Sequence, residues 1–560
     1  MPFTKIVATI GPSSFKEGVL EKMYKHGLSC IRINTAHIES GYIGKVMGIV
    51  TDLNSRLNRH VAVMVDLKGP ELRTGTFQGG HLDVVAGKHY RIPTGTGGGD
   101  IVLSHPEVTK ILEPKDLILL SDGRVRMKVV SRNDDFLDVE SIDNGELRDR
   151  SRINIPGKFL PLGTVTDRDL MFLKEGIQAG VDFFAQSFVQ RREDVVSLQK
   201  TINDYGGNQF IISKIETKSG FQNIRDISRV SDFVMVARGD LGVELPLKEV
   251  AIAQKKIIEE SHRHGVPSIV ATQMLESMVS SSSPTRAEVS DVTNAILDNA
   301  DALMLSEESA VGQYPDLAVK YLAEIAEFVE SQKKEFSEPT EFLGNHVAYS
   351  IARASKVVAR EIQASAIITF SKTGNTPKMI SAVRPGIPII SVVTSRNLAN
   401  KLSLYSGVIP LLMENSRNDL GDFEIMMATV EKQTNLRKGE RVVVTSGAPY
   451  FLFGGTNEVR VSTVGKFMGR GYASGKGFRG PATSRPESGG GILIVPEKSK
   501  IGAAALASFS GVIFLDEIGH ALAEELREIG IPFVHNTKLL RPIEEGTMIF
   551  VDGSTGVITS

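Results

Sequence analysis

A lysine and a glutamate stand two residues apart in the apolar run 210–216, as Lys214 and Glu216. On an extended segment this spacing turns both side chains to the same face. A second carboxylate, Asp240, follows the next apolar run, after a glycine, Gly239, that lets a ligand approach the backbone closely. Two carboxylates on neighbouring strands suit a hard divalent cation that also takes substrate oxygens, as Mg2+ does. A structural salt bridge between Lys214 and the acids is the alternative interpretation.

Other cationic side chains and a hydroxyl group could take part in the chemistry of a phosphorylated substrate. Arg32, Arg73 and Lys214 can stabilise phosphate oxygens while charge builds up in a phosphoryl transfer. Thr272 ends another apolar run, where its hydroxyl can pass a proton through water. Solvated arginines and a helix-capping threonine are the alternatives.

The elements that must position these residues are short β-rich runs separated by stretches of helical periodicity. The runs are 5–10, 30–34, 61–66, 182–188, 210–216, 233–238, 268–272 and 302–306. Eight strand–helix units predict a parallel α/β architecture, a closed (β/α)8 barrel, whose strands end at one shared mouth. A doubly wound sheet also alternates strand and helix and is the alternative. Polar residues end nearly every run, namely Arg32, Asn34, Asp66, Ser187, Lys214, Glu216, Arg238, Asp240, Thr272, Gln273 and Ser306.

The rest of the chain predicts three further domains beside a barrel of residues 1–74 and 158–335. The insert 75–157 alternates short runs with glycine turns, which is typical of an all-β module, and its position suits a lid over the barrel mouth. Residues 336–465 predict an open α/β sheet. Residues 466–560 predict an appended small α/β domain, entered through a glycine-rich linker at 469–480.

Composition narrows the class of protein. The 560 residues carry 64 Lys and Arg against 66 Asp and Glu, without long runs of one charge, which disfavours nucleic-acid and membrane-surface binding. The single cysteine, Cys30, excludes an internal disulfide and indicates a reducing compartment. Because no apolar run approaches membrane-span length and no basic leader is present, we expect a cytoplasmic protein.

Five segments resemble pyruvate kinases, in order along the chain. They are TKIVATIGPSS at 4–14, KGPELRTG at 68–75, ISKIE at 212–216, ARGDLGVE at 237–244 and PTRAE at 284–288. The resemblance covers essentially the whole chain and implies the barrel, a β-barrel lid domain and an effector domain. It also implies phosphoryl transfer from phosphoenolpyruvate to ADP, giving pyruvate and ATP, by a homotetramer.

The resemblance also implies roles for individual residues. Lys214 neutralises the transferring phosphoryl group and the developing enolate, and Arg32 contacts the phosphate. Glu216 and Asp240 bind Mg2+ or Mn2+, and Thr272 lies where the enolate is protonated. The other implied residues are Ala237, Arg238, Gly239 and Ser187 for the substrate, and Asn34, His37 and Arg73 for the nucleotide.

The potassium site of the family is incomplete in this sequence. Asn34 and Asp66 are kept, but Ala36 and Leu67 replace a serine and a threonine, so two oxygen ligands are missing. Glu71 is retained, whereas family members that dispense with potassium often place a lysine there. The sequence therefore leaves the K+ requirement open.

The nucleotide side also departs from the family pattern. Val311 replaces a lysine that would face the nucleotide phosphates, and Glu307 adds an acid nearby. Ser151 replaces a second lysine, for which Arg150 or Arg152 can supply the charge. Nucleotide preference is therefore open, while the phosphoenolpyruvate half is intact.

Outside the barrel, one loop between a strand and a helix presents backbone N–H groups to an anion. It consists of Ser371, Lys372, Thr373, Gly374, Asn375 and Thr376. The resemblance implies that this loop binds the phosphate of an allosteric effector, and an ordinary capped turn is the alternative. The tail resembles a swivelling phosphohistidine domain of phosphoenolpyruvate-using enzymes. Its His520 lacks the usual hydroxyl neighbours, so we expect a structural or regulatory role.

Two other functions are weighed against the kinase. A lyase of the pyruvate and phosphoenolpyruvate barrel superfamily would not need the lid, Arg32 or Thr272. A non-catalytic, ligand-sensing paralogue would account for Ala36, Leu67 and Val311, but not for the intact set around Lys214.

Overall fold

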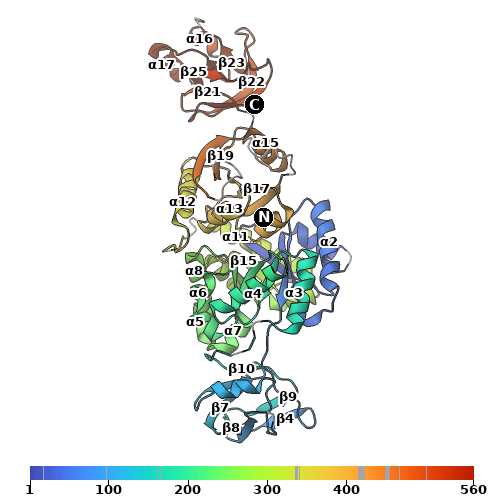
Figure 1. Cartoon of the computed structure of the whole chain (residues 1–560). Helices are drawn as coiled ribbons and strands as arrows, with labels where there is room; N and C mark the ends of the chain where they lie inside the picture. Colours follow the sequence, from blue (N-terminus) through green and yellow to red (C-terminus); the bar gives the residue numbers. More distant parts are fainter. Residues whose placement is uncertain are drawn as a thin grey trace. The chain divides into compact units, whose positions relative to one another are not determined.

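We describe the protein from a computed structural model (Figure 1). The structure describes residues 1–560 except 17, 96, 161, 164, 334–337, 340, 414–422, 448–454, 466, 498 and 500. Two compact units form, one of Met1–His346 with Arg396–Val408, the other of Val347–Ser395 with Ile409–Ser560. The predicted boundaries at 335/336 and 465/466 involve residues outside the described part. Within that part, no helix is long and apolar enough to cross a membrane.

The first unit contains the predicted barrel. Eight parallel strands close in the order β1-β2-β3-β11-β12-β13-β14-β15, so the doubly wound alternative is excluded. The strands are β1 (Lys5–Thr9), β2 (Leu28–Asn34), β3 (Ala62–Leu67), β11 (Phe183–Gln186), β12 (Phe210–Ile215), β13 (Phe233–Ala237), β14 (Ser268–Ala271) and β15 (Ala302–Leu305). All eight overlap the predicted runs, because strands buried on both faces are continuous apolar segments.

Helices surround this barrel and are started by local capping residues. Thr166 caps α3 (Asp167–Ala179) and Thr285 caps α9 (Arg286–Leu297), each in a reciprocal box with an acid three residues on. The other helices are α1 (Val19–Lys25), α2 (Tyr42–Arg56), α4 (Arg192–Asp204), α5 (Lys218–Gln222), α6 (Ile224–Ser228), α7 (Arg238–Glu244), α8 (Leu247–Arg263), α10 (Glu307–Ala310) and α11 (Pro315–Gln332). They bury one continuous apolar layer against the strands.

Aromatic side chains fill the amino-terminal half of the barrel. The rings of Phe183 and Phe233 meet edge to face with centroids 5.4 Å apart, and Phe233 meets Tyr405 at 4.8 Å. Tyr405 follows α14 (Arg396–Leu402), whose Lys401 donates to the Asn208 carbonyl at 2.7 Å. The far end of the barrel is thereby closed by a segment that comes late in the sequence. Buried Asp182 and Asp301 also lie at this amino end, where they accept from the N–H groups of Val63 and Ser268.

The insert after β3 is all-β, as predicted. An antiparallel sheet has the order β10-β6-β7-β8-β5, and β4 pairs with β9. The strands are β4 (His81–Val84), β5 (His89–Pro93), β6 (Leu117–Leu120), β7 (Val125–Arg132), β8 (Phe136–Ser141), β9 (Gly145–Arg148) and β10 (Ile153–Asn154). The insert has an apolar core of its own. We refer to residues 75–157 as the lid, after the role predicted for them.

The second unit contains the predicted open sheet, in the order β18-β17-β16-β19-β20. Its elements are α12 (His346–Glu361), β16 (Ala366–Phe370), α13 (Asn375–Ala382), β17 (Ile389–Val393), β18 (Val408–Leu412), α15 (Phe423–Gln433), β19 (Arg441–Ser446) and β20 (Glu458–Thr463). β20 is antiparallel to its neighbour and was missed, because exposed residues interrupt its apolar pattern.

The tail forms a closed barrel of seven strands, in the order β21-β25-β24-β23-β22-β26-β27. Its elements are β21 (Phe467–Ala473), β22 (Phe478–Thr483), β23 (Ile492–Val495), α16 (Ala503–Leu506), β24 (Gly511–Phe514), α17 (His520–Glu528), β25 (Phe533–Leu539), β26 (Met548–Val551) and β27 (Val557–Thr559). The predicted linker at 469–480 is wrong, since it lies mostly in β21 and β22. A Cβ at Gly471 would lie 2.4 Å from Thr537 Oγ1, so this glycine allows strands to pack closely.

The packing of α3 against β11 yields a test of the barrel. A Cβ at Gly176 would lie 2.8 Å from Cζ of Phe184, whereas one at Gly48 in α2 meets nothing within 4 Å. We expect Gly176→Ala to destabilise the protein by about 1–3 kcal/mol through overpacking. Gly48→Ala should stabilise it by about 0.5–1 kcal/mol. Thermal unfolding of the two full-length variants checks this, and shifts in the same direction would contradict the packing described.

Candidate active site

Lys214 lies at the centre of a charged cluster at the mouth of the first barrel. Its ammonium is 2.8 Å from Oε1 of Glu216 and 3.1 Å from Oδ1 of Asp66, and it donates to Ser187 Oγ at 2.7 Å. The side chains come from the ends of β12, β3 and β11. Two-residue spacing on β12 places Lys214 and Glu216 on the inward face, as predicted.

Asp66 bridges two cations and is almost completely buried, with 3% of its surface exposed. Besides Lys214, its carboxylate accepts from Arg32 Nε at 2.8 Å and pairs with Arg32 Nη2 at 2.7 Å. Arg32 Nη1 donates to Thr9 Oγ1 at 2.8 Å, on the neighbouring strand. The guanidinium is therefore held on two sides, with its remaining donors available to a ligand.

The backbone at the end of β11 is shaped around Glu216. Phe188 has a φ of 54°, a left-handed conformation that is uncommon for a large side chain. Its N–H donates to Glu216 Oε2 at 2.8 Å. The preceding residue, Ser187, donates its hydroxyl to the Leu67 carbonyl at 2.7 Å. Each oxygen of Glu216 thus already has one partner before any ligand binds.

Burial and charge compete in this cluster. Burial alone would raise the pKa of Asp66, but Lys214 and Arg32 hold that pKa below its ordinary value. Burial alone would lower the pKa of Lys214, but Asp66 and Glu216 outweigh this effect and raise that pKa. Burial raises the pKa of Glu216 despite Lys214, and the negative charge of Asp240 adds to the increase. Lys214 is consequently a permanent cation at neutral pH.

Thr272 forms the centre of a second group, at the end of β14. Its Oγ1 accepts from the Gly239 N–H at 2.9 Å and donates to the Ala271 carbonyl at 2.6 Å. Arg238 donates to the Thr272 carbonyl at 2.6 Å and pairs with Asp291 at 2.6 Å. Thr272 has a φ of 69°, which costs about 1–3 kcal/mol for such a residue. The surrounding contacts therefore hold this threonine in a strained, fixed position.

Asp240 lies between the two groups and is partly exposed. Its Oδ1 pairs with Nη1 of Arg152, from the lid, at 2.5 Å. Glu216 and Asp240 lie near enough for the charge of one to affect the pKa of the other. A divalent cation would relieve the repulsion between these two carboxylates, so the donor set fits Mg2+ or Mn2+.

The residues predicted for the nucleotide lie at the edge of this mouth. Asn34 caps the short helix Thr35–His37 by accepting from Ala36 N at 3.1 Å, and His37 is exposed. Arg73 donates to Glu71 at 2.6 Å and to the Arg150 carbonyl at 2.7 Å. Val311, where a lysine is usual, is exposed at the end of α10.

The predicted effector loop 371–376 lies in the second unit, where residues 371–374 join β16 to α13 and the last two residues begin that helix. Gly374 has a φ of 86°, and its N–H donates to Ser371 Oγ at 2.9 Å. Thr376 is buried and shares a hydrogen bond of 2.8 Å with Thr456. The loop is therefore a well-formed turn at a helix start.

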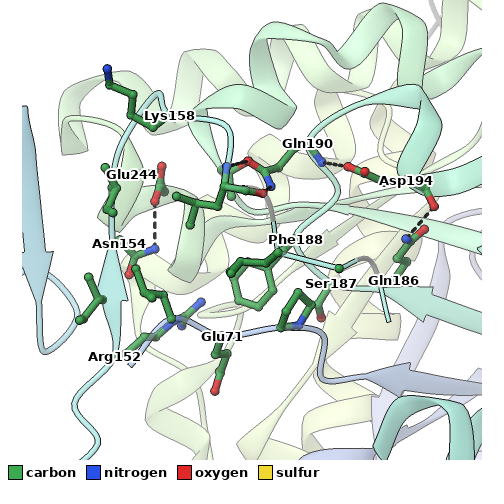
Figure 2. A pocket seen from close by; sticks show the side chains of 18 residues that line it. Glu71, Arg152, Asn154, Lys158, Gln186, Ser187, Phe188, Gln190, Asp194 and Glu244 are labelled. Carbon is green, nitrogen blue, oxygen red and sulfur yellow. Dashed lines mark hydrogen bonds between the residues drawn. The ribbon is translucent and has the colours of Figure 1, made fainter. Parts of the chain in front are cut away.

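A pocket beside the cluster lies under the lid and is shown in Figure 2. Phe188 and Ser187 form the wall that it shares with the Lys214 cluster. On the opposite wall Asn154 donates to buried Glu244 at 2.9 Å, and burial raises the pKa of that acid. The charged cluster, rather than this pocket, contains the groups suited to phosphoryl transfer.

Several contributors were missed by the sequence analysis. Thr9 ends β1 and is the penultimate residue of the predicted run 5–10, so a search of the strand ends could have found it. Asp291 belongs to a helix and has no local signal. The N–H of Phe188 depends on a backbone conformation that residue types do not reveal.

The fold and this site define a class: a (β/α)8 enzyme whose barrel mouth combines fixed cations with carboxylates suited to a divalent metal. Two family models match the chain, the pyruvate kinase barrel domain over residues 1–319 and the pyruvate kinase alpha/beta domain over 349–462. The chain belongs to the pyruvate kinase family, and it functions as a pyruvate kinase, which is a phosphotransferase.

Individual pyruvate kinases are similar to this chain along most of its length. The chain is 49% identical to a pyruvate kinase of Thermoplasma acidophilum, over 99% of this chain and 98% of that protein. It is 37% identical to one of Thermotoga maritima, over 83% of this chain and all of that protein. A crystal structure of a pyruvate kinase from Cryptosporidium parvum has a TM-score of 0.75 at 30% identity, over 83% of this chain and 96% of that one.

The position of Asp66 between two cations yields a test of the cluster. Asp66→Asn leaves Arg32 beside Lys214 with one carboxylate fewer, so we expect a loss of about 3–5 kcal/mol in unfolding free energy at pH 7. The pKa of Asp66 is lower in the folded protein than in the unfolded chain. The difference in unfolding free energy between the wild type and Asp66→Asn should therefore be full above the ordinary aspartate pKa, and it should be lost as the pH falls through the pKa of the folded state. Thermal and urea unfolding across pH measure it.

A matched control is Asp143→Asn, which removes the carboxylate of an exposed pair with Arg126 on the lid. Its loss should be much smaller because water screens the pair. Inorganic phosphate should recover part of the Asp66→Asn loss and none of the control loss. Equal effects of the two substitutions would contradict the role given to Asp66.

Proposed function

We propose that the charged cluster at the barrel mouth moves the phosphoryl group of phosphoenolpyruvate to ADP, giving pyruvate and ATP. The observation that supports this most is the joining of Arg32, Asp66, Lys214 and Glu216 through contacts of 2.7–3.1 Å. Two fixed cations beside each other match a substrate that carries a phosphate and becomes an enolate. Positioning and charge neutralisation supply most of the catalysis for such a transfer.

Each step has a group suited to it. Arg32 binds phosphate oxygens through donors that Asp66 and Thr9 do not use. Lys214 offsets the charge of the transferring phosphoryl group while the bond to the enol oxygen breaks and a bond to the ADP oxygen forms. The enolate left behind takes a proton on carbon, and the hydroxyl of Thr272 delivers it through water. Ser187 orients Lys214, while the backbone of Ala237, Arg238 and Gly239 contacts the substrate.

Glu216 and Asp240 hold the divalent cation in this proposal. Pyruvate kinases generally depend on Mg2+ and K+. Bound Mg2+ or Mn2+ would neutralise phosphate charge at the site. Asn34, His37 and Arg73 lie toward the nucleotide, and the arginines beside Ser151 supply the positive charge that this serine and Val311 lack.

The remaining parts of the chain regulate or support this reaction. The loop 371–376 binds the phosphate of an effector at the start of α13. His520 is 83% exposed at its side chain and begins α17, which suits a structural or regulatory tail better than a phosphohistidine carrier. The assembly is a homotetramer of the kind expected for the family.

The monovalent cation is dispensable in this proposal. The side chain of Leu67 is buried in the barrel core, and Ala36 has no oxygen to offer. Glu71, the acid that argues for a cation, already pairs with Lys68 at 3.0 Å and with Arg73 at 2.6 Å. The negative charge near the site is therefore compensated by the protein.

The function is tested by pyruvate release from phosphoenolpyruvate with ADP and Mg2+, and by its loss in Lys214→Met. We expect this variant to lose at least about a thousandfold in turnover, because the charge that builds up in the transition state has no fixed cation. Lys248→Met, at an exposed position of α8, serves as the control. Near-normal turnover of Lys214→Met would refute the role of the lysine. A wild-type protein that binds phosphoenolpyruvate and Mg2+ without turnover would favour the non-catalytic paralogue or the lyase.

The second test compares turnover in K+ with turnover in Na+ at equal ionic strength. We expect wild-type rates to differ by less than about twofold, since small surface effects of salt remain. The double variant Ala36→Ser, Leu67→Thr restores the missing oxygens and should acquire a response to K+. Strong K+ activation of the wild type would show that Glu71 still recruits a cation.

A further inference from the structure

Arg152 stands where the lid joins the barrel. Its backbone forms an isolated antiparallel bridge with Arg73, the corresponding residue on the other connection of the lid. The Arg152 carbonyl accepts from Ser121 N at 3.0 Å, which ties it to the β6 end of the lid. The side chain therefore starts from a fixed backbone point at the hinge.

The guanidinium extends from this hinge into the barrel mouth. It pairs with Asp240 at 2.5 Å, and its centre lies 5.2 Å from the ring centroid of Phe188. Figure 2 shows Arg152 next to that ring at the edge of the pocket. Phe188 is the residue whose N–H fixes Glu216. The side chain is only 20% exposed, so water screens the Asp240 pair weakly.

The electrostatic surroundings of Arg152 match those of a cation site. Burial lowers its pKa, but the negative charges of Asp240, Glu216 and Glu71 raise it above the ordinary value. Asp240 and Glu216 are the same two carboxylates to which we assigned the divalent cation. A guanidinium paired with Asp240 and a metal ion bound to that carboxylate disfavour each other, because two positive charges beside one carboxylate repel.

We propose that Arg152 is a built-in counter-cation for the divalent-metal site: it neutralises Asp240 while the site is empty and is displaced when the metal binds. When it is displaced, the guanidinium leaves Asp240 and stays on the lid beside Ser151, where its positive charge is available to the phosphates of the nucleotide. Metal binding is thereby coupled to the lid and to the nucleotide side of the site. The inference rests on the proposed metal role of Glu216 and Asp240.

The test measures Mn2+ binding to the full-length protein without substrate, from the electron paramagnetic resonance signal of free Mn2+. Arg152→Gln removes the competing charge, so Mn2+ should bind about tenfold more tightly than to the wild type, equivalent to about 1.4 kcal/mol. Arg152→Lys keeps the charge and should bind Mn2+ nearly as weakly as the wild type. Arg124→Gln removes an exposed charge elsewhere on the lid and should leave the affinity unchanged.

Three results would overturn the inference. Unchanged or weaker Mn2+ binding by Arg152→Gln would show that the arginine does not compete. Equal tightening by Arg152→Lys would assign the effect to a loosened lid rather than to charge. Equal tightening by Arg124→Gln would show that the net charge of the lid, rather than the Arg152–Asp240 pair, weakens Mn2+ binding.

Asp240→Asn separates a failure of this inference from a failure of the metal site itself. If Asp240→Asn abolishes Mn2+ binding and Arg152→Gln has no effect, the metal site stands and the counter-cation is refuted. If Asp240→Asn binds Mn2+ like the wild type, the proposed site and the inference resting on it both fall.

Discussion

The burial of Asp66 between Arg32 and Lys214 is the interaction on which the barrel mouth depends. Two cations held side by side repel each other, and removing them from water costs several kcal/mol per ion. One carboxylate with both oxygens engaged offsets these costs and fixes both side chains at once. A site for an anionic substrate is thereby formed by the protein itself, with its positive charges already in place.

The rest of the barrel serves this cluster by controlling which residues face inward. Alternation along β12 puts Phe210 and Lys214 on one face, so the same strand fills the amino end with an aromatic ring and the mouth with a charge. Tyr405, following α14, packs against Phe233 and closes the apolar end. Water therefore reaches the charges from the mouth side, where the lid and the pocket lie.

Much of this arrangement follows from sequence because strand ends are local features. Lys214, Glu216 and Asp66 could be predicted because they lie at or near the ends of apolar runs. A closed parallel barrel must bring such strand ends together. The pairing of Arg152 with Asp240 was beyond sequence reasoning, since it joins residues 88 positions apart through the folded lid. The glycines at 469–480 were misinterpreted because a flexible linker and closely packed strands both favour residues without a side chain.

Six charged side chains around Lys214 and Asp240 are balanced before any ligand binds. Arg32, Lys214 and Arg152 provide three cations, and Asp66, Glu216 and Asp240 provide three carboxylates. A cluster without net charge has little long-range attraction for a phosphorylated acid. In the proposed exchange, replacing a singly charged guanidinium by a divalent cation would turn this balance into a positive excess beside the proposed phosphate site. Under this proposal, affinity for the substrate would depend on the metal for electrostatic reasons alone, even before direct coordination contributes.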